Sequence, residues 1–311
     1  MHMHAHSHDH GHDHGHHHAP QDFGRAFLIA IVLNVGFTAI EFIYGFMANS
    51  SALMADAGHN LSDVLGLVLA WGGALLAKRQ PDSRFTYGLR SSSILAALAN
   101  AMFLMFACGV IGWDAVNSLL HPPQVATDTV MVVAAIGIVI NGLSAWLFVK
   151  GSKDDLNIRG AFLHLAADAA VSLGVVIAGA VIMVTGWNWL DPVVSLLIVL
   201  VIVYGTWGLL RDSMKLALNA VPSHIDLPAV ARYLREQDGV QDIHDLHIWA
   251  MSTTESALTV RLIMPAGYPG DAYMDQLAAG LKETFRIDHS TLQIAQGDSE
   301  HVCTLHARHE H

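Results

Sequence analysis

Two short segments pair a histidine with an aspartate four residues further on, and each lies deep inside a long apolar run. His59 and Asp63 form one pair, and His164 and Asp168 form the other. Side chains at i and i+4 share one face of a helix, so two such helices facing each other would present two imidazoles and two carboxylates to one point. This ligand set suits a tetrahedral Zn²⁺ site. Ionisable groups are costly in hydrocarbon and mark pathways or binding sites, so the pairs predict a metal site inside a membrane.

A simpler interpretation is that each histidine only hydrogen-bonds the aspartate of its own helix. For a single motif this interpretation would be favoured. Two motifs of the same spacing, both in apolar segments, favour one shared site. Small residues that would let the two helices approach closely flank both pairs: Ala55, Ala57, Gly58, Ala166 and Ala167.

The composition is that of an integral membrane protein with a more polar appendage. Hydrophobic residues make up 53% of the 311 residues and charged residues only 14%, against about 25% charged residues in soluble domains. The net charge of -11 and a pI near 6.0 exclude the basic surface typical of nucleic-acid binding. Cys108 and Cys303 are the two cysteines, so one chain cannot supply a disulfide framework or four thiolate ligands.

Six apolar segments are each close to the ~20 residues that a membrane-spanning helix needs. They cover residues 24–47, 51–77, 92–119, 127–149, 160–186 and 189–210. The connections after the first, third and fifth segments contain no Lys or Arg, whereas the others carry Lys78, Arg79, Arg84, Arg90, Lys150, Lys153 and Arg159. Because positive charge stays on the cytoplasmic side, both termini are predicted to be cytoplasmic. The residues before Arg25 are polar, so no cleavable signal peptide is expected.

The change in composition after about residue 210 predicts a second domain. We expect a histidine-rich cytosolic tail over residues 1–22, a six-helix transmembrane bundle over 23–210, a cytosolic domain over 211–298 and a tail over 299–311. In the cytosolic domain the pattern predicts a helix capped by Asp226 and reaching Gln237, strands over 240–251 and 257–264, a helix capped by Asp271, and a strand over 290–295. The order αββαβ indicates a small α+β sandwich.

Both tails contain histidines whose role the sequence leaves open. The first eighteen residues hold ten of the 21 histidines, a composition that binds divalent metals loosely. The alternative is an appended purification tag, but the Ser, Asp, Gly and Met residues that interrupt the run favour a native metal-gathering tail. Residues 300–306 are expected to be disordered, with weak metal binding.

Other polar residues also lie in the apolar segments. Glu41 and Asp114 are expected at the pore mouth or the membrane interface. Asp56, one turn before the first histidine, either lines an exit path or caps the start of its helix. Asn34 and Asn141 are either donors to the metal ligands or ordinary interhelical hydrogen-bond partners, and the second is favoured.

In combination these features resemble the cation diffusion facilitators, and among them the CzcD-like and ZnT-like zinc exporters. The resemblance rests on the six spans, the histidine-rich N-terminus, the two HxxxD motifs, Arg84-Phe85-Thr86-Tyr87-Gly88 and His244-Asp245-Leu246-His247-Ile248-Trp249. It implies a homodimer, in a bacterial plasma membrane, that exports zinc in exchange for protons by alternating access. It also implies a ferredoxin-like cytosolic domain that dimerises and responds to metal. By motif position, His59, Asp63, His164 and Asp168 take the transport-site role, and a histidine first in the earlier motif implies a preference for zinc over cadmium.

The resemblance also bears on metal in the cytosolic domain. Some relatives bind a metal between spans two and three through histidines, but residues 79–87 contain none, so that site is not expected. His244 matches a ligand position in relatives, and His289 is a second candidate ligand for regulatory zinc. Period-two alternation places His244 and His247 on opposite strand faces unless the strand is bulged. His247 is therefore expected to be a packed residue beside Trp249.

A charge pair between Arg90 and Asp212, at the cytoplasmic ends of spans three and six, is a further hypothesis from the resemblance. Relatives use such a pair to hold the two membrane bundles of the dimer together. The alternative is that both are solvated charges that follow the positive-inside rule.

These features favour a transporter over an enzyme. Metal binding requires neutral imidazoles and ionised carboxylates, so protons compete with the metal and can drive its release. An intramembrane zinc hydrolase would need an open water position and a general base, and neither segment carries the HExxH arrangement. A membrane-bound metal sensor is the other alternative. The expectation is an antiporter for zinc, with cadmium, cobalt or nickel as further cargo, that has divalent ions, protons and lipid as partners and no catalytic cofactor.

Overall fold

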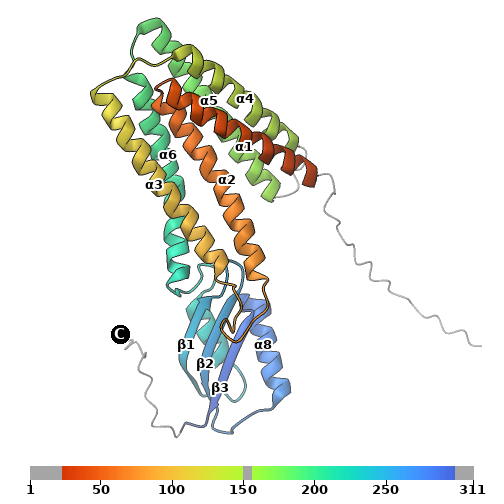
Figure 1. The fold of residues 1–311 in the computed structure, drawn as a ribbon. Helices are drawn as coiled ribbons and strands as arrows, with labels where there is room; N and C mark the ends of the chain where they lie inside the picture. The colour runs from red at the N-terminus through yellow and green to blue at the C-terminus, as the bar shows by residue number, and fades with distance from the viewer. Residues whose placement is uncertain (1–22, 150–155, 298–311) are drawn as a thin grey trace, which may run out of the picture.

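The computed structural model describes residues 23–149 and 156–297, and it places six long helices before a small α+β domain. Figure 1 shows the helices as an elongated bundle with the C-terminal domain at one end. The histidine-rich tail and residues 300–306 lie outside the described residues. The six helices are α1 (Phe23–Met47), α2 (Ser51–Ala77), α3 (Ser92–Leu120), α4 (Thr127–Phe148), α5 (Leu156–Thr185) and α6 (Leu190–Ala217). Each predicted segment is helical, and α6 continues beyond residue 210 toward the C-terminal domain.

The helical part of the chain is a membrane domain. Within the described residues, α3, α4, α5 and α6 are long and apolar enough to cross a bilayer, and α1 has a shorter apolar stretch over Val32–Met47. Large apolar and aromatic side chains on these helices are exposed, among them Phe106, Trp113, Trp146, Val184 and Tyr204. Such a surface is stable against lipid rather than water. Helix α2 carries three ionisable residues in its first half, Asp56, His59 and Asp63.

The six helices form two groups. Helix α2 packs against α3 and α6, whereas α4 packs against α5 and α1. Helix α1 also packs against α2, while α2 and α5 have few contacts. Toward the C-terminal domain, the group of α1, α4 and α5 diverges from the group of α2, α3 and α6 (Figure 1). A cavity between the two groups is lined by residues of α2, α3, α5 and α6.

The start of α2 is fixed by a carboxylate from α6. Ser50 is the N-cap residue, and its hydroxyl accepts a hydrogen bond from the backbone N–H of Leu53 and donates one to Asp191 at 2.5 Å. Asp191 is buried and also accepts the N–H of Ala52 at 3.2 Å. An anion at a helix N-terminus is stabilised by the unpaired N–H groups there. Because Ser50 caps α2, the alternative in which Asp56 caps the start of this helix is wrong.

The C-terminal domain follows the predicted order of elements. It consists of α7 (Leu227–Arg235), β1 (Asp242–Ala250), β2 (Ser256–Ile263), α8 (Asp271–Phe285) and β3 (His289–Ala295). In the described chain the sheet has the order β1-β2-β3, with β1 and β2 antiparallel and β2 and β3 parallel. Asp226 precedes α7 without a capping side-chain bond, and Gly270 rather than Asp271 is the cap position of α8.

Both helices of this domain pack on the same face of the sheet. The shared core contains Val230, Leu234, Leu258, Leu262, Leu277 and Leu281. Residues of β2 that alternate with this core, including Thr259 and Arg261, are only partly buried. The opposite face of the sheet is therefore free of helices in the described part of the chain.

The conformation of the connection between α2 and α3 depends on the Asp82 side chain and on Gly88. The Asp82 carboxylate accepts the backbone N–H groups of Arg84 and Phe85, both at 2.8 Å, and these bonds lower its pKa. Gly88 has a φ of +70°, and a Cβ at this position would lie 2.6 Å from the carbonyl oxygen of Arg79. Gly88 is therefore required both by its backbone conformation and by the close approach of the chain.

We expect Gly88→Ala to destabilise the protein, because a side chain at positive φ costs about 1–3 kcal/mol and this one also meets a carbonyl. The thermal midpoint in detergent should fall. Gly72→Ala is the matched control, since a Cβ there has no heavy atom within 4 Å. Equal midpoints for Gly88→Ala and the wild-type protein would contradict this account of the loop.

Candidate metal site

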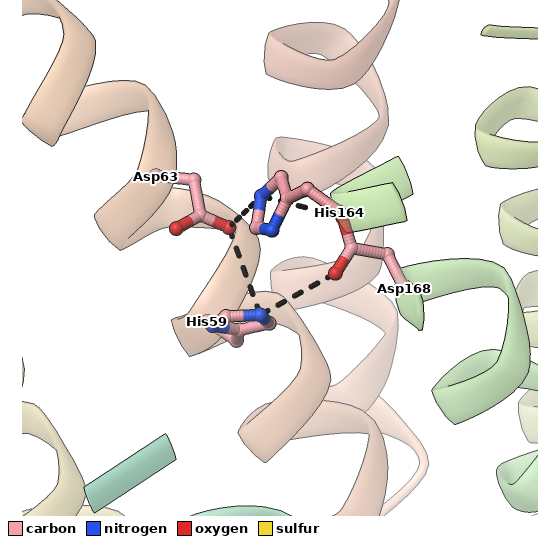
Figure 2. A group of neighbouring side chains, drawn as sticks. All are labelled: His59, Asp63, His164 and Asp168. Carbon is pink, nitrogen blue, oxygen red and sulfur yellow. Dashed lines mark hydrogen bonds and ion pairs between the residues drawn. The ribbon is translucent and has the colours of Figure 1, made fainter. Parts of the chain in front are cut away.

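The structure brings together the side chains of His59, Asp63, His164 and Asp168, here called the His–Asp cluster. Each residue offers one ligand atom, and these atoms all lie within 4.8 Å of one another. Figure 2 shows the four side chains pointing toward one another, two from α2 and two from α5. No other group of three or more His, Cys, Asp or Glu ligands is this close in the described chain.

The histidine-to-aspartate distances within the cluster are close to the edges of a tetrahedral ligand set. Across the two helices, Nε2 of His164 lies 3.1 Å from Asp63 Oδ2, and Nε2 of His59 lies 3.4 Å from Asp168 Oδ1. Within each helix the corresponding distances are 3.7 Å for His59 and Asp63 and 3.6 Å for His164 and Asp168. Ligand atoms around a tetrahedral Zn²⁺ lie roughly 3.3–3.6 Å apart. The contacts between helices are the shorter ones, so the arrangement is more than a hydrogen bond within each helix.

Exposure of the cluster falls with distance from the C-terminal domain. His164 and Asp63, one turn nearer that domain on their helices, have side-chain exposures of 45% and 32%. His59 and Asp168, one turn further away, have exposures of 21% and 5%. The next acidic residue along α2, Asp56, is fully buried. The cluster is therefore open toward the C-terminal domain and closed toward the far end of the bundle.

A cavity of about 540 Å³ leads to the cluster between α2, α3, α5 and α6. Its lining is mostly apolar, with polar groups from Ser62, Asn100 and Thr206. The Ser62 hydroxyl and the Asn100 amide oxygen are buried and have no hydrogen-bond partner in the described residues. Sequence reasoning missed Asn100, although an amide within the apolar stretch of α3 is a signal that could have identified it.

The sequence matches two family models over most of its length. Residues 27–216 match the cation efflux transmembrane domain, and residues 222–296 match the cytoplasmic domain of cation efflux proteins. The chain belongs to the cation efflux family. This family consists of secondary transporters rather than enzymes, as the absence of an HExxH motif from the two metal-ligand segments predicts.

Named bacterial relatives of this cation efflux protein include several transporters. A cadmium, cobalt and zinc/H(+)-K(+) antiporter of Bacillus velezensis is 34% identical over 77% of each chain. The metal cation efflux system protein CzcD of Cupriavidus metallidurans is 35% identical over 86% of this chain and 85% of its own. The zinc transporter ZitB of Escherichia coli is 34% identical over 87% of each chain.

In the cytoplasmic domain, His244 and His247 lie on the same face of the sheet. The register between β1 and β2 shifts between these two residues, and Asp245 adopts a φ of 52°. This is a β-bulge, which adds one residue and resets the alternation of side chains. Both histidines are exposed on the face without helices. The expectation that the two histidines lie on opposite faces is therefore wrong, because the strand contains the bulge that was named as the exception. The expectation that His247 is a packed residue is also wrong.

His289 lies elsewhere on the sheet. It pairs with Ala257 at the start of β3, whereas His244 pairs with Arg261 near the other end of β2. The His289 ring instead contacts Tyr87 edge to face, with centroids 5.7 Å apart. Within one chain the structure does not bring His244 and His289 together.

The polar residues of the membrane helices are placed differently from several expectations. Glu41 is fully buried and accepts a hydrogen bond from Asn60 at 2.9 Å, so its expected position at the interface is wrong. Asn141 is fully buried, and neither atom of its amide has a partner in the described residues, so it donates to none of the cluster. The backbone carbonyl of Asn34 accepts the hydroxyl of Thr38.

Asp114 lies at the far end of the bundle, where the sequence places it. It is exposed and accepts the Ser51 hydroxyl at 2.8 Å. It also lines a second cavity, of about 460 Å³, together with Asn117 and His121. This polar mouth lies beyond the buried layer around Asp56.

Within one chain Arg90 pairs with a residue other than Asp212, and an Arg90–Asp212 interlock between the two copies of a dimer stays a prediction. Its guanidinium pairs with Glu255 in the turn between β1 and β2, whereas Asp212 pairs with the neighbouring Arg211 at 3.3 Å. The Arg90–Asp212 interlock is not formed within the chain. The tertiary approach of the C-terminal domain to α3, which a span prediction does not contain, decides the partner of Arg90.

Two further hydrogen bonds hold the same junction. The Ser91 hydroxyl donates to the carbonyl of Met251 at 3.3 Å, and the backbone N–H of Thr253 donates to the Ser93 hydroxyl at 3.1 Å. The β1–β2 turn is thus attached to the first residues of α3. Movements of the C-terminal domain and of α3 are therefore mechanically connected.

We expect Arg90→Glu to lower the thermal midpoint, because it places two carboxylates together at this junction. Adding Glu255→Arg should restore most of the loss, with a coupling energy of about 0.2–1 kcal/mol for a half-exposed pair. Adding Asp212→Arg should not restore it. The reverse pattern in this double-mutant cycle would favour the Arg90–Asp212 interlock instead.

Proposed function

We propose that this protein is a proton-coupled antiporter that exports zinc from the cytoplasm by alternating access and so serves metal homeostasis and resistance. The observation that carries the proposal is the convergence of His59, Asp63, His164 and Asp168 from two helices of a membrane domain. The names of the relatives, which include a zinc transporter and a cadmium, cobalt and zinc antiporter, support this cargo. Cadmium, cobalt and nickel are secondary candidates.

The ligand set suits a cargo that must be bound and released. Two imidazoles and two carboxylates replace the hydration shell of Zn²⁺ within the bilayer. Thiolates, which form closed structural sites, are not among the ligands. The open side of the cluster, toward the C-terminal domain, lets the ion enter without crossing a buried layer.

Proton coupling follows from the same ligands. The metal binds neutral imidazole and ionised carboxylate, so each histidine or aspartate that takes up a proton weakens the site. Protons arriving from the far side would displace the ion and neutralise the cluster for its return. One set of side chains can thus carry both ions in alternation.

For the membrane arrangement, we propose that all six helices cross the bilayer and that both termini are cytoplasmic. The absence of Lys and Arg from the three far connections supports this orientation. The proposed units are the tail over 1–22, the membrane domain over 23–210, a ferredoxin-like domain over 211–298 and the tail over 299–311. With this orientation, the exposure of His164 and Asp63 describes a state open to the cytoplasm, in a bacterial plasma membrane.

We further propose that the protein works as a homodimer through the helix-free face of its sheet. That face carries His244 and His247 and leaves half of the small domain without a covering layer. Regulatory zinc would bind there through His244, with its remaining ligands from the second copy. His289, which lies against Tyr87, is the weaker candidate for this role.

The decisive test is zinc uptake into proteoliposomes, driven by a pH gradient across their membrane. His164→Ala and Asp63→Ala should each abolish pH-driven flux, because the loss of one of four ligands leaves an incomplete tetrahedron. The controls are His224→Ala and Asp128→Asn, which change an exposed imidazole and an exposed carboxylate outside the cluster. Undiminished flux in both cluster variants would exclude the site. Zinc binding without flux in the wild-type protein would favour a sensor.

Zinc binding should release protons, and the number released should rise as the pH falls, because the metal binds imidazole and carboxylate only in their deprotonated forms. Calorimetric titration in buffers of different ionisation enthalpy measures this number. The difference between the wild-type protein and the His59→Ala/His164→Ala variant isolates the cluster from the N-terminal histidines. If the binding heat of the wild-type protein minus that of the variant does not depend on the buffer, proton competition at the cluster is contradicted.

A further inference from the structure

A second polar layer lies beyond the His–Asp cluster, on the side away from the C-terminal domain. It consists of Glu41 on α1 and Asp56 on α2, with their hydrogen-bond donors Asn60 on α2 and Ser172 on α5. The exposures of these residues are 0%, 0%, 5% and 0% in the same order. Asn60 directly follows His59, so its backbone lies at the level of the cluster and its side chain reaches Glu41. Asp56 and Ser172 each lie about one helical turn beyond a cluster residue, so any ion that leaves the cluster toward the far end must pass this layer.

Two hydrogen bonds close the layer. The Asn60 amide donates to Glu41 Oε2 at 2.9 Å, and the Ser172 hydroxyl donates to Asp56 Oδ2 at 2.9 Å. The first bond joins α2 to α1, and the second joins α2 to α5. The two carboxyl groups lie close to each other. When both groups are ionised, the remaining oxygens, Oε1 of Glu41 and Oδ1 of Asp56, are buried and have no donor in the described residues. A proton on one carboxyl group lets the two side chains hydrogen-bond each other.

Stability of the fold does not account for this arrangement. Two ionised carboxylates in a medium of low dielectric repel each other, so this buried pair needs a cation between its members, either a shared proton or a metal ion. Neither residue caps α2, because Ser50 and Asp191 do so. Intramembrane acidic groups are retained where ions pass.

We infer that Glu41 and Asp56 form a release site for the exported divalent cation, one step beyond the His–Asp cluster. The inference rests on the proposed function and extends it by a second binding position. Its ligands would be the two carboxylates, which Asn60 and Ser172 hold in place by one hydrogen bond each. The two oxygens that lack donors are the ones available to a cation.

The chemistry of the two sites gives the ion a direction. The cluster offers two imidazole nitrogens, which bind zinc strongly, whereas the second layer offers only oxygen. Oxygen ligands suit hard cations and hold zinc less tightly. A cation that moves from the cluster to Glu41 and Asp56 therefore moves from a stronger to a weaker site, next to the polar mouth that contains Asp114.

The same layer keeps the far side closed in this structure. Close packing supports it, because a Cβ on Gly137 would lie 2.7 Å from the Phe37 ring and 3.1 Å from the Ser172 hydroxyl. Helices α1, α4 and α5 are thus in contact beside the two carboxylates. Separation of α2 from α1 and α5 would break both hydrogen bonds and free all four carboxylate oxygens for the cation.

The test uses the full chain in proteoliposomes with zinc as the probe. Glu41→Gln and Asp56→Asn, which preserve shape and remove charge, should each reduce zinc flux by about tenfold or more. The binding that the His59→Ala/His164→Ala variant retains is subtracted as background, and the remainder gives the zinc affinity of the cluster. This affinity should stay close to that of the wild-type protein. Glu41→Asp should retain part of the flux, and Asp128→Asn, an exposed carboxylate on α4, should retain all of it.

Three results would overturn the inference. The first is unchanged flux in both variants, and the second is loss of cluster affinity together with flux, which would make the pair a positioning element. The third is that downhill zinc flux persists in the variants but is no longer stimulated by a pH gradient. Glu41 and Asp56 would then be a proton site rather than a metal site. Failure of the proposed function is distinguishable, because the wild-type protein itself would then show no flux.

Discussion

The architecture depends on the cost of placing charge in hydrocarbon. An ionised carboxylate or imidazolium inside a bilayer is tolerated only with a partner, so His59, Asp63, His164 and Asp168 stabilise one another and any cation that they hold. Their contacts across α2 and α5 are shorter than those within each helix, so the two helices must keep a fixed rotation. The bond from Ser50 to Asp191 contributes to this by fixing the start of α2 against α6. A metal site and the packing of the bundle are thus determined by the same contacts.

The membrane domain is built asymmetrically around this site. Near the C-terminal domain the two helix groups diverge, and the cavity reaches the cluster past Asn100. On the far side α1, α2, α4 and α5 are packed together through Glu41, Asp56 and Ser172. One half of the bundle is therefore open by geometry, and the other is closed by hydrogen bonds that a rotation of the groups can break. In an alternating-access transporter, each conformation must be open on one side of the bound ion and closed on the other, as this one is.

The C-terminal domain is attached at the point where it can influence that rotation. Its β1–β2 turn is held to the start of α3 by Arg90, Ser91 and Ser93, and α3 belongs to the same helix group as α2. The helix-free face of the sheet, with both exposed histidines, lies in the same small domain. A change on that face can reach the membrane helices through a short chain of contacts.

The sequence by itself determined the helices, the order of elements in the small domain and the four residues of the His–Asp cluster. These properties are local, since apolar runs set the helix lengths and i, i+4 spacing places each pair on one helix face. Only the tertiary structure decided which buried groups meet. The burial of Glu41, the pairing of Arg90 with Glu255 and the bulge after His244 depend on helix rotation, domain approach and strand register. Those quantities are fixed by contacts between segments far apart in the chain, and no local pattern of residues encodes them.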